Sequence, residues 1–337
     1  MILSICIPSF NRFEKLVPSI TELLKSPSSD FEVVIVDNCS TESMSELLAI
    51  KDNRLRIIKR EIAVYGPKNI TECLKYALGE YAMLCLDKDR VDWRHIEDFV
   101  IALKNNDYIA GGYCVQNKSD DQYNIEIVSE EPILKLGYLN KHPSGDFYKT
   151  SCLKFLFENI KEDDVINSFS FDYFLAFCST QGSMMIYNKP LVYLEKAKDA
   201  KATKSLSFTR KANNLFFFPD NRIKEFKRQI LHMDQLNISN ETKVKKLRSL
   251  YRYNLNAVTF GFEDIMKNDM LCEHYRVEGK NIDYKELNQY RKQLNSLLYE
   301  FKIDYISTFK KKLWILVDNT KINIKLWHKK IVSIIRM

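Results

Sequence analysis

The chain has 337 residues, enough for one large domain with an appendage or for two domains. Its 45% hydrophobic and 28% charged residues are ordinary for a folded soluble protein and exclude a disordered chain. The eight cysteines include no C-x-x-C pair, so we expect buried thiols in a reducing cytosol rather than a disulfide framework or a zinc site. We also expect no signal peptide and no spanning helix, because the chain lacks a basic start and a run of about 18 uncharged apolar residues.

The first ninety residues alternate short apolar runs with segments of helical periodicity. The predicted strands are 3–7, 31–36, 54–60 and 81–86, and the predicted helices are 13–25, a segment ending at Ile50, and 69–78. Strands that alternate with helices favour an α/β fold with a doubly wound, mostly parallel sheet and right-handed crossovers.

The later part of the chain is predicted to complete this domain and then to become helical. We expect a helix at 93–104, strands at 107–116 and 123–128, helices at 151–157 and from 169, and a final strand at 187–193. Residues 196–210 read as a basic mobile loop that closes over the donor phosphates or links two domains. The helices expected beyond it are 223–236, 241–267 and 284–299, with Ser239 and Asp283 at capping-box-like starts.

Two carboxylates, Asp87 and Asp89, follow the predicted strand 81–86 directly. Ligands of open α/β sheets bind beyond the carboxyl ends of the strands. A D-x-D motif there offers hard oxygen ligands with room for waters and phosphates, which suits Mg²⁺ or Mn²⁺. Taken alone, the motif favours an acidic solvated turn over a metal site.

Three segments, in order, resemble family 2 glycosyltransferases: S-I-C-I-P-S-F-N-R, V-V-I-V-D-N-C-S, and G-P-K-N followed by A-L-G-E-Y-A-M-L-C-L-D-K-D. The resemblance covers about residues 1–110 well and 140–195 loosely. It implies the GT-A fold, a divalent cation and inversion at the anomeric carbon. Two positions depart from the family pattern. Cys39 stands where a glycine is usual, and Arg90 stands where a third acidic residue often follows.

The resemblance assigns donor-binding roles to residues of these motifs. Asp37 would accept the N3–H of a uracil ring, because an ionised carboxylate only accepts hydrogen bonds. Its alternative role is an Asx turn or helix cap. Asp87 would hold the ribose hydroxyls or a metal-bound water, and Asp89 would ligate the metal. Pro8 and Phe10 are expected to wall the base and ribose, and the other predicted donor-site residues are Asn11, Arg12, Asn38 and Lys68.

In the resembled family, the second half of the domain forms the acceptor-binding side. A carboxylate at the start of a helix there acts as the general base. Asp172 matches that position, and a helix N-terminus keeps a carboxylate ionised. Asp146 is the second candidate, and the acidic cluster 162–164 is a weaker third. His142 precedes a Pro-Ser-Gly turn and is either a diphosphate contact or a plain loop residue.

The last segment carries the net charge. Residues 305–337 hold eight of the 51 basic residues and one of the 44 acidic ones, so the rest of the chain is balanced. In 324–336, apolar positions 324, 327, 331, 334 and 335 share one helix face, and Trp314 and Trp327 lie nearby. A basic amphipathic helix of this kind is typical of a membrane interface, whereas a terminal helix docked on its own domain is the alternative. We expect no nucleic-acid partner, because no known nucleic-acid module accompanies the charge.

Together these patterns predict a GT-A domain at 1–200, a helical region at 201–304 and a basic tail at 305–337. The predicted activity is transfer of a sugar from a nucleotide-diphosphate donor, expected to be a UDP-sugar, to a glycan or lipid-linked acceptor in surface polysaccharide synthesis. The predicted location is the cytoplasmic face of the cell membrane. The alternatives are a sugar-phosphate nucleotidyltransferase, which needs a glycine-rich loop that 7–12 lacks, and a catalytically degenerate GT-A scaffold.

Overall fold

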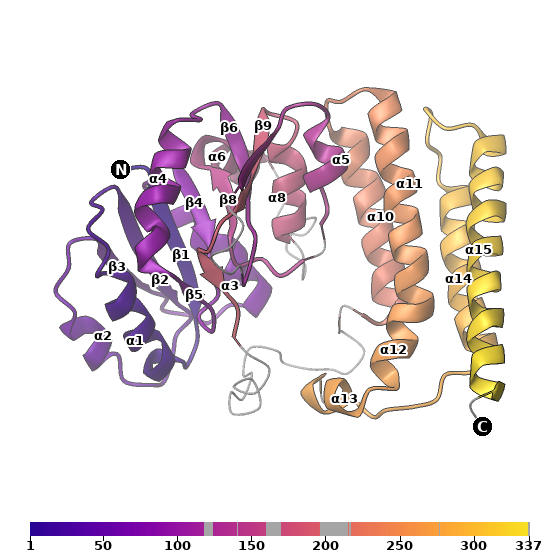
Figure 1. Cartoon of the computed structure of the whole chain (residues 1–337), viewed down its shortest axis with the longest axis horizontal. Coiled ribbons are helices and arrows are strands. Elements are labelled where there is room, and N and C mark those ends of the chain that lie inside the picture. The colour runs from indigo at the N-terminus through magenta and orange to yellow at the C-terminus, as the bar shows by residue number, and fades with distance from the viewer. Residues whose placement is uncertain are drawn as a thin grey trace. The chain divides into compact units, whose positions relative to one another are not determined.

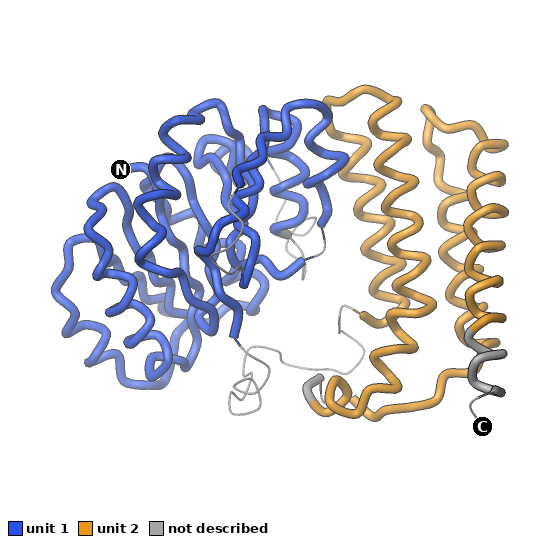
Figure 2. The backbone as a smooth tube through the Cα atoms, viewed as in Figure 1, with its two compact units in different colours: residues 1–209 blue, residues 210–337 orange. Residues whose placement is uncertain are grey.

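The computed structural model describes residues 1–117, 124–139, 141–159, 170–195, 215, 217–275 and 277–335. The chain forms two compact units, Met1–Thr209 and Arg210–Met337 (Figure 2). The boundary predicted at residue 200 falls outside the described residues, so it stays a prediction. Residues 305–335 belong to the second unit rather than to a separate part of the chain.

The first unit is built on an eight-stranded sheet with the order β3-β2-β1-β4-β8-β6-β9-β7 (Figure 1). Parallel pairs join β1 to β2 and β4, β2 to β3, and β6 to β9, whereas β8 and β7 run antiparallel to their neighbours. A separate two-stranded sheet pairs β5 (Arg90–Val91) with β10 (Val192–Tyr193). The strands of the large sheet are β1 (Leu3–Ser9), β2 (Phe31–Asp37), β3 (Leu55–Lys59), β4 (Tyr81–Leu84), β6 (Ile109–Cys114), β7 (Asn124–Val128), β8 (Asp146–Lys149) and β9 (Ser183–Asn188). The predicted fold class, a mostly parallel sheet followed by a helical region, is confirmed.

Helices cover the sheet because their apolar residues recur at three- and four-residue steps. In α1 (Phe13–Leu23), the buried side chains are Phe13, Leu16, Ile20 and Leu23, and they share one core with residues of α2, α4 and the sheet. Helix α8 contacts both α3 and α6, and none of the core residues just described belongs to these three helices. The remaining helices of this unit are α2 (Ser45–Ala49), α3 (Gly66–Glu72), η1 (Cys73–Tyr76), η2 (Trp93–His95), α4 (Ile96–Lys104), α5 (Pro132–Leu136), α6 (Thr150–Asn159) and α8 (Ser170–Cys178).

Strand β8 is the main difference from the expected elements. We expected residues 144–148 only to lead into a helix, but 146–149 form a central strand between β4 and β6. Four residues are too few for an alternation signal, and their burial comes from the strands on either side. The strand expected at 187–193 is also divided, because a bend at 189–190 separates β9 from β10.

The register brings the carboxyl ends of β1, β2 and β4 together. Ser9 lies opposite Asp37, and the amide of Cys85 donates to the carbonyl of Cys6 at 3.0 Å. The loops that leave these three strands therefore start side by side. This edge of the sheet is where open α/β folds bind ligands.

The second unit is helical throughout its regular elements. Ser239 and Asp283 cap α11 and α14 as predicted, with side-chain oxygens that accept from the amides of Thr242 and Lys285. The helix expected at 241–267 is interrupted by a π-helical turn, η4 (Ala257–Gly261). The helices are α10 (Pro219–Gln235), α11 (Asn240–Asn256), α12 (Phe262–Met266), α13 (Asp269–Tyr275), α14 (Tyr284–Glu300) and α15 (Thr308–Ile335). Across the described parts of the chain, no helix combines the length and the apolarity that crossing a bilayer requires.

Candidate functional site

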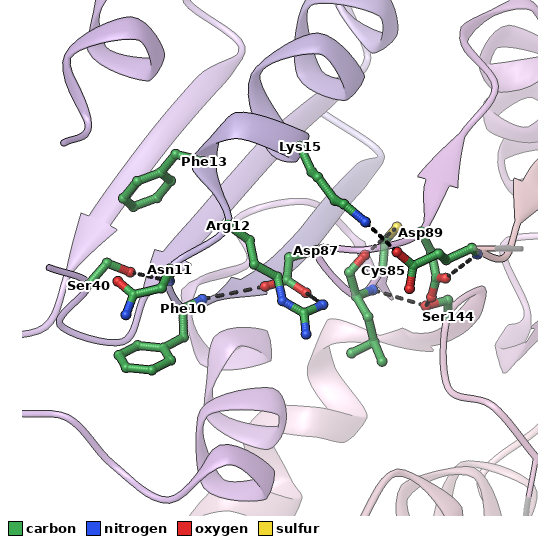
Figure 3. Close-up of polar contacts among 12 residues, drawn as sticks. Phe10, Asn11, Arg12, Phe13, Lys15, Ser40, Cys85, Asp87, Asp89 and Ser144 are labelled. Carbon is green, nitrogen blue, oxygen red and sulfur yellow. Dashed lines mark hydrogen bonds and ion pairs between the residues drawn. The ribbon is translucent and has the colours of Figure 1, made fainter. Parts of the chain in front are cut away.

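Asn11 ties together the loops that follow β1 and β2. Its backbone is left-handed, with φ 51°. Asparagine adopts this conformation more readily than most other residues with a side chain. Its amide donates to Ser40 Oγ at 2.8 Å, and its side-chain oxygen accepts from the amide of Thr41 at 2.8 Å (Figure 3). Asn11 is therefore positioned to fix the shape of this edge, next to Phe10.

Asp37 ends β2 with no exposed surface. Both of its carboxylate oxygens accept from the amide of Ser40 at 3.2 Å, and Ser40 Oγ also donates to Oδ1. This is the local turn contact that we considered as the alternative role of Asp37. It occupies both acceptor positions of Oδ1 and leaves acceptor capacity on Oδ2, because each carboxylate oxygen accepts two hydrogen bonds.

Cys39 occupies the position where the resembled family usually has glycine, and its φ is 63°. This left-handed conformation favours glycine and costs other residues free energy. The chain therefore keeps the turn that the family glycine would make, although it lacks the glycine.

The other predicted donor-site residues line the same edge. Pro8 lies inside β1, opposite Val36, whereas Phe10 is half-buried beyond the strand end. Asn38 anchors the loop before α3 by two reciprocal 2.8 Å hydrogen bonds with the backbone of Val64. Lys68 lies on α3, with its ammonium 4.0 Å from Glu72, on the helix that follows this anchored loop.

Asp87 is held by the loop that follows β1. Arg12 makes an ion pair with its Oδ1 at 3.2 Å, and the amide of Phe10 donates to its Oδ2 at 3.4 Å (Figure 3). Burial raises the pKa of Asp87 to about 6, and the charge of Arg12 offsets part of that rise. Asp87 and Arg12, two of the predicted donor-site residues, are thus in contact at this edge of the sheet.

Asp89 is enclosed by segments that are distant in the sequence. Ser144 Oγ donates to its Oδ2 at 2.5 Å, the amide of Glu195 donates to its Oδ1 at 2.9 Å, and His142 Nε2 lies 3.5 Å from Oδ2. Lys15 Nζ in turn pairs with Glu195 at 2.5 Å (Figure 3). Burial lowers the pKa of His142, and the charge of Asp89 counteracts this shift.

Sequence reasoning missed Ser144, Glu195 and Lys15 as members of this site. No spacing rule connects them to Asp89, because they lie 55 or more residues away from it along the chain. The Ser144-Gly145 turn was the one sequence feature that could have indicated a constrained loop near Asp89. Gly145 has φ 95°, and a Cβ there would lie 3.1 Å from the carbonyl oxygen of Cys114.

The D-x-D carboxylates offer oxygen donors for a divalent cation. Among the described residues, no group of three or more His, Cys, Asp or Glu side chains is arranged to hold a metal ion. Arg90 does not add to the donor set, since its guanidinium lies 4.8 Å from the centre of the Tyr193 ring. Two carboxylates fit Mg²⁺ or Mn²⁺ bound mainly through substrate phosphates and water, and each retains free lone pairs.

The two base candidates share a buried charged cluster with Lys141. Lys141 Nζ lies 2.9 Å from Asp146 Oδ1, and Asp146 and Asp172 have no exposed surface. Burial lowers the pKa of Lys141, and the charges of both carboxylates raise it in part. Burial also raises the pKa of Asp146 to about 6. Asp172 lies in the first turn of α8, as predicted, and the third candidate cluster, 162–164, lies outside the described residues.

The structure thus gathers the predicted residues into two groups. The donor-side group surrounds Asp37 and Asp87 at the ends of β1, β2 and β4, and the acceptor-side group surrounds Asp146 and Asp172 between β8 and α8. His142 and Ser144 connect the two groups, because they lie in the segment between Lys141 and Asp146 and also contact Asp89. The functional roles of these residues stay predictions.

Comparisons with a family model and with known sequences all match glycosyltransferases. The family model described as "Glycosyl transferase family 2" matches residues 4–163. Glycosyltransferase GlyG of Streptococcus pneumoniae serotype 4 is 24% identical over 135 residues, which are 39% of this chain and 45% of GlyG. The Escherichia coli "UDP-Glc:alpha-D-GlcNAc-diphosphoundecaprenol beta-1,3-glucosyltransferase WfgD" is 27% identical over 122 residues, which are 35% of this chain and 48% of WfgD. The chain therefore spans about half the length of these relatives.

Solved structures support the fold over most of the chain. The crystal structure of S. aureus TarS 1–349 has a TM-score of 0.53 with 15% identity, and the match covers 88% of this chain and 91% of that one. The same protein in complex with UDP-GlcNAc matches with a TM-score of 0.52 and 15% identity over the same shares of the two chains. At this identity the likeness concerns the fold alone.

Proposed function

Because residues 4–163 of this chain belong to glycosyltransferase family 2, we propose that it is a metal-dependent, inverting glycosyltransferase that uses a UDP-sugar. Its acceptor would be a lipid-linked glycan of surface polysaccharide synthesis, at the cytoplasmic face of the membrane. The observation that carries the proposal is the meeting of Asp37, Phe10 and Asp87 at the adjoining carboxyl ends of β1, β2 and β4. A nucleoside-binding site needs a hydrogen-bond acceptor for the base, an apolar surface against the rings and a carboxylate for the ribose hydroxyls. Asp37, Phe10 and Asp87 would supply these in turn.

A uracil donor is favoured by the chemistry of Asp37 and by two comparisons. The carboxylate of Asp37 accepts hydrogen bonds and donates none when ionised, which suits the N3–H of uracil. WfgD is named for UDP-Glc, and TarS was solved with UDP-GlcNAc. Pro8 and Phe10 would pack against the base and ribose, and Asn11 and Asn38 would hold the loops around them.

The donor diphosphate would lie beyond Asp87 and Asp89, with Arg12 and Lys15 nearby. A divalent cation bound by Asp87 and Asp89 would supply positive charge to the leaving diphosphate. Arg12 pairs with Asp87 and so keeps that carboxylate in place, while Ser144 and the amide of Glu195 fix the orientation of Asp89. A carboxylate fixed in advance binds its ligand without further ordering cost.

Asp172 would act as the general base in a single displacement. The acceptor oxygen attacks the anomeric carbon, its proton passes to the carboxylate, and the bond to the diphosphate oxygen breaks with inversion. Asp172 lies in the first turn of α8, where the helix field favours the ionised form that a base requires, whereas Asp146 lies in strand β8. Asp172 is therefore preferred, and Asp146 is the alternative.

The proposal is tested by calorimetry with UDP, UDP-Glc, UDP-GlcNAc and GDP-mannose, each with and without Mn²⁺. We expect uridine nucleotides to bind, and Mn²⁺ to strengthen binding to the wild type but not to Asp89→Ala. A matched control is Asp107→Ala, a carboxylate outside the site. Equal UDP affinity with and without Mn²⁺ in the wild type would remove the metal from the proposal. Absence of both binding and hydrolysis for every nucleotide sugar would favour the degenerate scaffold.

A further inference from the structure

The second unit exposes a row of large apolar side chains along α15. Their exposed fractions run from 46% to 76%, and they are Phe309, Leu313, Leu316, Ile324 and Trp327. Steps of three and four residues, with Thr320 between them, place all five on one side of a helix with 3.6 residues per turn. An apolar row of this length is unusual on a protein surface and marks an interaction site.

The opposite side of α15 anchors the helix to its own unit. Trp314 is 2% exposed, and the guanidinium of Arg248 lies 5.6 Å from the centre of its ring. Arg291 donates to Asn319 and Asn323 at 2.9 and 2.8 Å. The prediction that both tryptophans serve one interface is therefore wrong for Trp314. The helix is docked on its unit and still presents a second apolar side.

Lysines border the exposed row on both sides. Lys310, Lys321 and Lys325 are exposed and make no ion pair with the acidic residues that the structure describes. On the other border, Lys312 lies over the ring of Tyr299 at 5.6 Å. The single acidic residue of α15, Asp318, is buried and pairs with Arg252 at 3.0 Å. The exposed side of α15 is thus apolar along its middle and cationic along its edges.

A cavity of about 430 Å³ opens beside this row, between α11 and α15. Its lining includes Lys321, Lys325 and Ile324, together with Arg252 and the Asp318 that pairs with it, so the two lysines give the recess its net positive charge. A cationic recess next to an apolar side chain has the chemistry that fits a phosphate head group with its attached lipid chain.

We propose that this lysine-bordered side of α15 binds the surface of a bilayer that contains anionic phospholipid. The apolar row enters the boundary between head groups and acyl chains, and the lysines contact lipid phosphates. A second copy of the chain fits less well, because a symmetric contact of the two α15 helices sets lysines against lysines, and the one acidic residue of α15, Asp318, is buried. Nucleic acid also fits less well, since five apolar side chains would lie against phosphates. The inference stands on the second unit alone and does not depend on the donor site.

The test is co-sedimentation of the full chain with vesicles of phosphatidylglycerol and phosphatidylcholine, compared with phosphatidylcholine alone, over a salt series. We expect binding to the anionic vesicles at low salt that weakens toward 1 M, where the Debye length is about 3 Å. Lys321→Glu/Lys325→Glu should weaken it by at least ~25-fold, about fivefold for each lysine removed. The control Lys224→Glu/Lys227→Glu changes two exposed lysines of α10 by the same charge and should bind like the wild type.

A second pair of variants tests the apolar row. Leu316→Gln/Trp327→Gln should lose anionic-vesicle binding by tenfold or more, whereas Leu231→Gln, at a 45% exposed position of α10, should not. Circular dichroism verifies that each variant is folded. The proposal is overturned if the wild type ignores anionic vesicles at low salt, or if Leu316→Gln/Trp327→Gln binds them unchanged. It is equally overturned if light scattering finds a dimer that this variant converts to monomer.

Discussion

The buried pair of Asp146 and Lys141 makes a prediction about stability and pH. Asp146 has no exposed surface, and burial raises its pKa from 3.8 to about 6 despite Lys141 at 2.9 Å. As the pH rises from 4 to 6, the unfolded chain releases this proton while the folded chain still holds it. The folded state is therefore the one that binds more protons, and its stability falls as the pH rises. The difference between the two pKa values corresponds to ~3 kcal/mol.

Asp146→Asn removes this titration while preserving the shape of the side chain. We expect the variant to be no more stable than the wild type at low pH, and to lose ~2 kcal/mol less of its unfolding free energy than the wild type between pH 4 and 6.5. Part of the wild-type slope also comes from Asp87, whose pKa is raised to about 6 as well. Asp87 is present in both proteins, so the difference between their profiles isolates Asp146.

Urea unfolding at a series of pH values provides the measurement. The chain has three tryptophans, and Trp93 is the one in the first unit. In a Trp314→Phe/Trp327→Phe background its fluorescence therefore reports the unit that contains Asp146. Parallel profiles for the two proteins would mean that Asp146 titrates near its ordinary pKa, and the account of the buried pair would be refuted.

Two further predictions concern activity and backbone conformation. Asp172→Asn retains shape and capping but not basicity, so we expect sugar transfer to fall by ~10²–10⁴-fold with donor affinity unchanged, measured by transfer kinetics and calorimetry. Wild-type transfer by this variant would shift the role to Asp146 or remove it from both. Cys39→Gly should alter unfolding free energy by less than ~1 kcal/mol, because relief of the left-handed backbone offsets the added chain entropy. Cys39→Val should cost ~1–3 kcal/mol, and equal stabilities of the two variants would contradict the strain.

The donor half of the fold could be predicted from sequence because its signals are local. Strands β1, β2 and β4 are short, mostly apolar runs, interrupted by Ser4 in β1 and Glu32 in β2, and each run stops at polar residues that mark the carboxyl edge of a parallel sheet. The placement of Asp37 and Asp87 at one edge follows from that rule alone. Nothing beyond the alternation of strands and helices was needed.

The surroundings of Asp89 could not be predicted, because they depend on which distant segments meet. Ser144 reaches it through β8, a strand of four residues inserted between β4 and β6. Glu195 reaches it through the pairing of β10 with β5.

The tail is a different case. Its helix was predictable, but α15 has two apolar sides, and sequence alone does not tell which of them packs on the unit through Trp314.

During synthesis, Asp89 emerges before the residues that later donate hydrogen bonds to it. Glu195 follows Asp89 by 106 residues, so at ~5–20 residues per second its amide emerges ~5–20 s later. Strands β1 to β4 can assemble during that interval, since all four precede residue 85. For about the first half of that interval, until β8 (Asp146–Lys149) is synthesised, the nascent sheet carries an aspartate without its donors Ser144 and Glu195 and a β4 edge without its partner β8. An unpaired edge strand is a template for wrong pairing. The newborn domain is therefore most exposed to aggregation before β8 is synthesised, while its candidate site is incomplete.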